Sequence, residues 1–485
     1  MSNEIFSESL AYNNIKRRAV SSRSYRVRLP PSNATSFVPG NVIQFDLPAN
    51  LAGTYFNSNQ CYLKFNLKNT SKINAGGADG SASFRLDRPG AYSLIRRLQI
   101  STAGAQLQDT DRYNVLACAM LDTDASHEWK ASVGKSLCGI QTSSAGEWVG
   151  GTTTAGPSPV PLPNGRDYCL PLILNVLSQS TPHRFFPLFS LSPIQLRFTL
   201  EDAINAFKTV GDAPVLDYAL SEVELVMMLT ELSPSAQASV DAMTGGRYDI
   251  LATSWSNSTA TKGAGAAALT ANLGISVSSL ERVIIIHRKQ DVANGADSTF
   301  TLGGRDTAGI TEYSLLINSE QYPARPIRAD ALYGAEPMAE LLQADHSLAN
   351  FQKGNGLNNA LIHSTRDYAP NNMFFMQNPS SAMESVGYVL RDTDQDDAGA
   401  VGDGGAITKS NVGFFVASIE LESGISDGKS SHIYSGISTL ASTVQFLGKY
   451  DVVAAPGAYT LDFFSNFTVL ISLNMRGTGV YSVSV

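Results

Sequence analysis

Residues 194–201 constrain the fold of this chain more than any other stretch, because apolar and polar side chains alternate strictly along them. One set is apolar and the other polar: Ile194, Leu196, Phe198 and Leu200 against Gln195, Arg197, Thr199 and Glu201. A period of two predicts a β-strand with one face in a core. Pro187 and Pro193 bracket this strand, since proline cannot donate to a sheet ladder. Similar short segments fill most of the chain, which favours an all-β structural building block over an enzyme.

The chain has 485 residues, too many for one ordinary core. Residues 233–247 are rich in Ser, Ala and Gly and are predicted to be a linker. The predicted organisation is a basic N-terminal arm at 1–23, a first β-sandwich at 24–232, the linker at 233–247 and a second β-sandwich at 248–485.

The two predicted sandwiches have similar orders of predicted strands and helices. The first contains a strand at 94–100 and then a helix at 110–121, and the second contains a strand at 313–317 and then a helix at 335–351. Each half also ends on long strands. The separation of roughly 220–245 residues is too long for a solenoid repeat. The pattern indicates two copies of one β-sandwich, the alternative being a coincidence between two β-rich halves.

Charged residues make up 16% of the chain, below the roughly 25% of typical soluble domains. This composition suits faces that pack against neighbouring subunits, or simply a loop-rich β protein. The net charge of -8 excludes a globally basic nucleic-acid binder. The N-terminal region is locally basic, however, and is predicted either to contact nucleic acid or a membrane or to be a solvated tail. Its basic residues are Lys16, Arg17, Arg18, Arg23, Arg26 and Arg28.

No apolar stretch of the kind found in signal peptides follows the N-terminus, and no run of about 18 apolar residues predicts a membrane span. The four cysteines form no C-x-x-C pair and have no zinc-site spacing. We therefore expect reduced, mostly buried thiols, as in a protein made in the cell interior.

Catalytic motifs are weak. Residues 424–428 match G-x-S-x-G, but no helical pattern follows them, and the six histidines are dispersed. We predict no catalytic residue and no cofactor. One candidate metal site has carboxylates at alternate positions, which suits the oxygen coordination of a structural Ca²⁺. It consists of Asp392, Asp394, Asp396 and Asp403. Asp397 stands where an EF-hand loop requires glycine, so a solvated acidic loop is the alternative.

Two successive β-sandwiches, each with a helix after a central strand, resemble the double jelly-roll major capsid proteins of tailless icosahedral viruses. That lineage includes adenovirus-type hexons, virophages and Polinton-like viruses. The stretches that carry the resemblance are residues 186–201, residues 315–327 with the helix that follows, and residues 434–439. The resemblance covers roughly residues 20–485.

The resemblance implies two consecutive eight-stranded jelly-roll β-sandwiches with short helices in loops. It also implies pseudo-hexameric homotrimers that contact neighbouring capsomers, penton or minor capsid proteins and form an icosahedral shell. The arm would face the genome or an internal membrane, and no small-molecule substrate is expected. The protein would reside in the virion capsid, after synthesis in the host cell interior without a secretory signal.

The alternative function is a carbohydrate-binding or glycan-processing β-sandwich that acts as a monomer through its acidic loop and its tryptophans, Trp129, Trp148 and Trp255. A third hypothesis is a secreted adhesin, and the lack of a predicted signal peptide argues against it.

Overall fold

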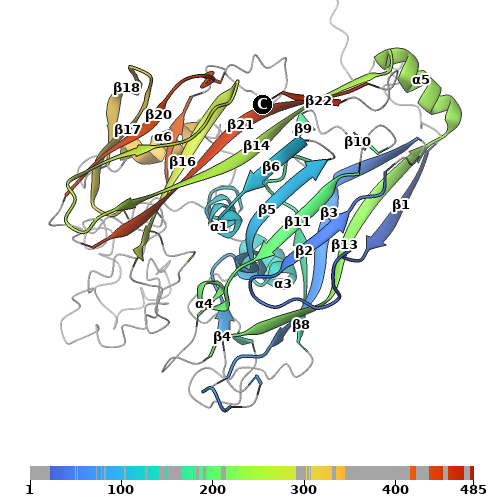
Figure 1. The fold of residues 1–485 in the computed structure, drawn as a ribbon, viewed down its shortest axis with the longest axis horizontal. Helices are drawn as coiled ribbons and strands as arrows, with labels where there is room; N and C mark the ends of the chain where they lie inside the picture. Colours follow the sequence, from blue (N-terminus) through green and yellow to red (C-terminus); the bar gives the residue numbers. More distant parts are fainter. Residues whose placement is uncertain are drawn as a thin grey trace, which may run out of the picture.

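The computed structural model is dominated by β-strands (Figure 1). The described residues are 22–49, 51, 53–72, 74–77, 79–80, 84–102, 105–125, 129–140, 148–149, 165–177, 180–181, 185–188, 193–208, 215–290, 302, 305, 307–329, 335–344, 415–421, 436–451, 457–474 and 481–484.

The first half of the chain forms two large antiparallel sheets and a small one of β4 (Phe84–Leu86), β7 (Trp148–Val149) and β12 (Phe207–Lys208). One has the order β1 (Ser22–Leu29), β13 (Tyr218–Leu232) and β3 (Thr54–Asn69), and β3 also pairs with β8 (Arg166–Pro171) and β10 (Phe186–Pro187). The other has the order β2 (Val42–Asp46), β11 (Gln195–Leu200), β5 (Ile95–Thr102) and β6 (Ala105–Thr110). In β11, Leu196 and Phe198 are buried and Arg197 is exposed, so the predicted alternation is confirmed.

The second half also forms two antiparallel sheets. One has the order β14 (Arg247–Lys262), β21 (Tyr459–Asn474), β16 (Leu280–Lys289) and β19 (Ala417–Glu420), and β22 (Tyr481–Ser484) pairs with β21. The other has the order β15 (Ala268–Asn272), β20 (Val444–Tyr450), β17 (Ile310–Ile317) and β18 (Glu320–Arg328). Phe446 of β20 and Phe463 of β21 lie 5.0 Å apart between their centroids and join the two sheets.

The two halves repeat one topology strand for strand. In each half the first strand pairs with the last, as β1 with β13 and β14 with β21. The order β1-β13-β3-β8 corresponds to β14-β21-β16-β19, and β2-β11-β5-β6 corresponds to β15-β20-β17-β18. A helix follows β6 in the first half and β18 in the second. The fold is therefore a double jelly roll, as the resemblance implied.

Helices occupy the connections, together with short strands. They are η2 (Gly90–Leu94), α1 (Tyr113–Asp124), η3 (Lys130–Gly134), α3 (Lys135–Cys138), α4 (Ala203–Ala206), α5 (Pro234–Thr244) and α6 (Ala335–Ala344). The short strands are β4 (Phe84–Leu86), β7 (Trp148–Val149), β9 (Ser180–Thr181) and β12 (Phe207–Lys208). The helix predicted at 110–121 begins later, at Tyr113, because β6 extends to Thr110. The helix predicted at 335–351 is confirmed as far as Ala344, and the remainder lies outside the described residues.

The predicted linker contains a helix, α5. The Ser233 side chain accepts a hydrogen bond from the backbone N–H of Ala236, and Pro234 occupies the first turn. Both features start helices. Gly245 ends α5 in the left-handed conformation, with a φ of 63°. The connection between the jelly rolls is thus a capped helix rather than an irregular linker.

Candidate functional site: the seam between the two jelly rolls

Helix α1 lies where the two jelly rolls meet, a contact region that we call the seam (Figure 1). Every residue of α1 from Tyr113 to Leu121 is buried. A helix that is buried on all sides needs apolar residues around its whole circumference, and the run from Val115 to Leu121 provides them. The Tyr113 hydroxyl donates to the Ile173 carbonyl over 2.7 Å and fixes α1 to the first jelly roll.

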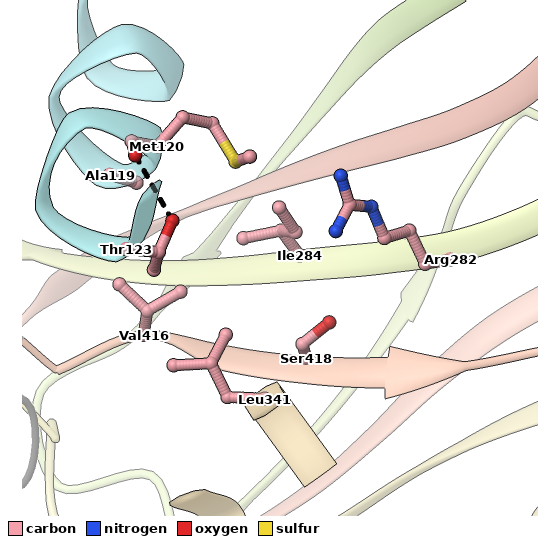
Figure 2. Close-up of a pocket in the computed structure, with 8 residues that line it drawn as sticks. All are labelled: Ala119, Met120, Thr123, Arg282, Ile284, Leu341, Val416 and Ser418. Carbon is pink, nitrogen blue, oxygen red and sulfur yellow. Dashed lines mark hydrogen bonds between the residues drawn. The ribbon is translucent and has the colours of Figure 1, made fainter. Parts of the chain in front are cut away.

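The opposite side of α1 packs on the second jelly roll. Ala119, Met120 and Thr123 approach β16 and β19, and Leu341 of α6 lies beside them (Figure 2). Between these groups lies a cavity of about 10 Å³, which is room for about one water molecule. It is lined by Ala119, Met120, Thr123, Arg282, Ile284, Leu341, Val416 and Ser418. The two jelly rolls are therefore packed closely where α1 crosses the seam.

The sheets of the two halves also join. Asp109 of β6 pairs with Ser256 of β14 in parallel, giving one sheet with the order β19-β16-β21-β14-β6-β5-β11-β2. Beside this pair, the Thr110 hydroxyl donates to the Trp255 carbonyl over 2.8 Å. The Ser254 hydroxyl donates to the Leu107 carbonyl over 3.2 Å. Because both hydroxyls are buried, each bond replaces water that cannot reach the group.

Trp255 is the largest fully buried side chain of the described residues, and it lies in this junction. The Arg282 guanidinium carbon lies 5.2 Å from its ring centroid, a cation–π distance. Arg282 also donates to the Ala344 carbonyl at the end of α6 over 2.8 Å. Trp255 stands within β14.

Buried charges cross the seam as well. Asp122 of α1 forms ion pairs with Arg88 at 3.2 Å, with Lys130 at 3.5 Å and with Arg305 of the second half. Burial alone would raise the pKa of Asp122, but these three cations hold it well below the usual value of a carboxyl. Asp87 nearby accepts a hydrogen bond from the backbone N–H of Leu302 over 2.9 Å. Two points of the second half are thus anchored to the first.

Helix α5 links the two halves a further time. The Tyr55 hydroxyl of β3 donates to Gln237 over 3.0 Å, and the Tyr248 hydroxyl of β14 donates to Asp241 over 2.5 Å. Burial and the hydrogen bond to Asp241 raise the pKa of Tyr248. Gln237 in turn donates to Asp241 over 2.8 Å. Packing, sheet pairing, buried charge and this polar network hold the jelly rolls in one arrangement.

The structure places only part of the predicted basic site. Arg23, Arg26 and Arg28 lie on β1, so Arg23 belongs to the sheet and not to the arm predicted at 1–23. Arg23 pairs with Glu231 at 4.0 Å and Arg28 with Glu224 at 3.4 Å. The other three predicted residues, Lys16, Arg17 and Arg18, lie outside the described residues.

The predicted calcium ligands Asp392, Asp394, Asp396 and Asp403 also lie outside the described residues. Within the described part of the chain, no cluster of three or more His, Cys, Asp or Glu side chains could hold a metal ion. All four cysteines are free, and three of them are buried, as predicted. Of the helices that the structure describes, none is long and apolar enough to cross a membrane.

Comparison with solved structures gives this fold a context. The chain is similar to the PBCV-1 virus capsid structure, at 9% identity, covering 97% of this chain and 98% of that one with a TM-score of 0.56. It is similar to the Sputnik virophage structure, at 10% identity, covering 100% and 93% with a TM-score of 0.56. It is also similar to the Faustovirus major capsid protein, at 10% identity, covering 96% and 92% with a TM-score of 0.56.

These similarities extend over nearly the whole of each chain, so both jelly rolls and their arrangement contribute to them. At such low identity they establish the shared fold, which is that of capsid proteins. By sequence, no protein-family model and no curated protein matches the chain.

The residues of the seam were not predicted as functional. Asp122 and Arg305 are 183 positions apart, and neither belongs to a recognisable motif. The one local signal was the apolar circumference of α1. A surface helix would carry a polar face, so this composition indicates that a second body covers it.

Proposed function

We propose that this chain is a major capsid protein that assembles as pseudo-hexameric trimers into an icosahedral shell enclosing a viral genome. The observation that carries the proposal is the seam, which locks two jelly rolls of one topology into a single body. The similarity in fold to capsid structures over nearly the full chain supports it. The described residues suggest no chemistry, and the proposed role is non-enzymatic.

The physical reasoning concerns symmetry. Three copies of a two-part rigid body present six similar units, which can occupy a hexagonal place in a shell while using only one kind of chain. In a closed assembly many modest contacts act together, so each one can be weak. A flexible connection between the jelly rolls would lose this advantage, because every contact would also have to fix the internal angle of the subunit.

The proposal includes the predicted partners. Neighbouring capsomers, penton or minor capsid proteins would surround the trimer in the virion, and the chain would be made inside the host cell. The basic residues Lys16, Arg17 and Arg18 would contact the genome or the acidic headgroups of an internal membrane in a salt-sensitive way. Arg23 and Arg28 already have carboxylate partners, so they are less available for this role.

A structural Ca²⁺ at Asp392, Asp394, Asp396 and Asp403 remains part of the proposal, as a stabiliser of a loop or a subunit contact. Calorimetric titration with Ca²⁺ tests it, using a variant with all four aspartates changed to asparagine as the control. Equal heats from the two proteins would rule the site out.

The native mass of the purified protein, measured by light scattering on a sizing column, tests the capsid proposal. We expect about three times the 51.7 kDa of one chain, or a larger shell, and electron microscopy should then show hexagonal capsomers. A stable monomer that binds glycans would overturn the proposal and favour the carbohydrate-binding alternative.

A further inference from the structure

The seam joins two different surfaces of the same kind of jelly roll. The first jelly roll contributes the edge strand β6 and the helix α1 that follows it. The second contributes the edge strand β14 and the outer face of the sheet β14-β21-β16-β19. Strand β16 shows that this face is the outer one. Its His287 points towards Tyr450 of the opposite sheet, and side chains alternate along a strand. Arg282 and Ile284 are an odd number of positions from His287, so they point outward to α1. The contact is therefore heterologous.

Because the jelly rolls share one topology, each has a surface of both kinds. The seam within one chain uses the strand-and-helix surface of the first jelly roll and the outer sheet face of the second. Among the described residues, no helix of the chain is seen to pack on the outer face of β1-β13-β3 in the first jelly roll as α1 packs on the second. This sheet corresponds to the one that receives α1 in the second half. Strand β1 borders the first jelly roll on the side remote from the second (Figure 1). The second jelly roll keeps β18, which corresponds to β6. It also keeps the exposed side of α6, which corresponds to α1 and already contributes Leu341 to the seam.

The outer face of β1-β13-β3 has the composition of an interface, and we call it the β1 face. It includes Arg26, Arg28, Tyr62, Lys64, Glu224 and Met228. Tyr25, Val27 and Leu29 pack on the core, so the arginines between them point outward. In the strand register, Arg26 of β1 stands opposite Met228 of β13. Arg28 stands opposite Val226 of β13, which in turn stands opposite Tyr62 of β3. Tyr, Met and Arg are enriched where proteins associate.

The arginines of the β1 face are exposed, and Tyr62, Lys64 and Met228 are half-buried. Arg28 pairs with Glu224, whereas Arg26 forms no ion pair with any described residue. Arg26 thus stands beside the half-buried Met228 without a carboxylate partner among the described residues, and its charge favours an acidic partner.

Helix α6 supplies acidic groups of this kind. Glu336 and Glu340 are one turn apart on the helix. Burial raises the pKa of Glu340, and the charge of Glu336 raises it further. No cation of the described residues forms an ion pair with Glu340, so a guanidinium brought close to it would stabilise its charged form.

The edge of β18 restricts the manner of contact. Pro323 and Pro326 lie on this edge strand and cannot donate backbone hydrogen bonds. A partner cannot extend the sheet there along an unbroken ladder. Contact through this side of the second jelly roll must therefore be made by side chains, as α1 does across the seam.

We propose that the β1 face of one copy receives helix α6 of a second copy, which repeats between chains the heterologous contact that the seam makes within one chain. The inference rests on the proposed capsid function and specifies its first assembly step. A heterologous contact of this kind closes into a ring when the rotation between successive units permits. Arg26 of one copy would then pair with Glu340 of the next.

Charge reversal tests the contact. We expect Arg26→Glu and Glu340→Arg each to weaken assembly of the full chain by at least about tenfold, and the double variant to recover most of it. Light scattering over a concentration series measures the dissociation constant. Lys449→Glu is the control, since it reverses an exposed lysine on β20, a strand that belongs neither to the β1 face nor to α6. Circular dichroism checks that all variants remain folded.

The outcomes separate this inference from the proposed function. A wild-type chain that stays monomeric at every concentration overturns both. A wild-type trimer that Arg26→Glu and Glu340→Arg leave as tight as Lys449→Glu overturns the contact alone and leaves the capsid role standing. Loss of assembly in both single variants without recovery in the double variant overturns the pairing of Arg26 with Glu340.

Discussion

Arg305 of the second jelly roll forms an ion pair with Asp122 of the first, and the arginine side chain is fully buried. Arg88 and Lys130 converge on the same carboxylate from the first half. One carboxylate therefore lies within ion-pair distance of three cations in the seam. Removing the carboxylate should therefore lower the stability of the fold far more than removing any single cation.

Replacing Asp122 by asparagine should lower the free energy of unfolding by about 3–5 kcal/mol, because three largely buried cations each lose an ion pair. Urea unfolding measures this loss. The control is Asp111→Asn, whose partner Arg96 lies 3.4 Å away on a half-exposed surface. Removing such a surface pair should cost at most about 1 kcal/mol. Equal losses in the two variants would contradict the importance of the buried cluster.

Acid should destabilise the chain through His287. Burial, together with the charge of Lys262, lowers its pKa to about 3. The unfolded chain binds this proton below about pH 6.5, and the folded chain does not, so stability falls as the pH drops from about 6.5 towards 3. Between pH 7 and pH 5 the loss should be about 2 kcal/mol.

The variant His287→Gln checks this pH dependence while preserving a hydrogen-bonding group for Tyr450, whose hydroxyl lies 3.1 Å from the histidine ring. Urea unfolding at a series of pH values should show a slope reduced by about one proton relative to the wild type. An unchanged slope would show that other groups cause the acid sensitivity.

Met120→Ala should enlarge the cavity in the seam and destabilise the protein by about 2–5 kcal/mol. Met243→Ala is a matched control, because this methionine of α5 is 80% exposed and packs against little. Scanning calorimetry would compare the two midpoints. If the midpoint of Met120→Ala matched that of Met243→Ala, the packing of α1 against the second jelly roll would contribute little to stability.

Neutralising Lys16, Arg17 and Arg18 together should reduce nucleic-acid binding and its dependence on salt. The slope of log K against log salt concentration should fall by about 2–3, since each phosphate contact releases close to one counter-ion. Fluorescence anisotropy with a labelled oligonucleotide measures this slope. Lys449→Ala provides the control, and an equal slope in both proteins would exclude these residues from the contact.

The sequence predicted strands best where one face is apolar. β11 and β13 follow that rule, whereas the sixteen-residue strand β14 was missed. Its second half contains Ser256, Asn257, Ser258 and Thr259, which look like a loop when the chain is read alone. Pairing with β21 along the entire length of β14 makes this segment a strand. Tertiary context overrides local propensity here.

The same limit explains the candidate site. The two β-sandwiches follow from repeated local patterns, so they could be predicted, and the resemblance to capsid proteins implied their jelly-roll topology. The seam depends on pairs such as Thr110 with Trp255 and Asp122 with Arg305, which lie 145 and 183 positions apart. Local periodicity cannot predict contacts between residues that are so far apart in the sequence. β18 was hidden for a different reason, since Pro323 and Pro326 are compatible only with an edge strand.

The burial of α1 from both sides sets an order for biosynthesis. A ribosome completes α1 long before it reaches Arg305, and at roughly 5–20 residues per second the interval is roughly 10–40 s. During that time the apolar helix lacks the cover that β16, β19 and α6 of the second jelly roll provide. A nascent chain in this state is a natural client for a holdase chaperone, and translation pauses between residues 125 and 305 would lengthen its exposure to aggregation.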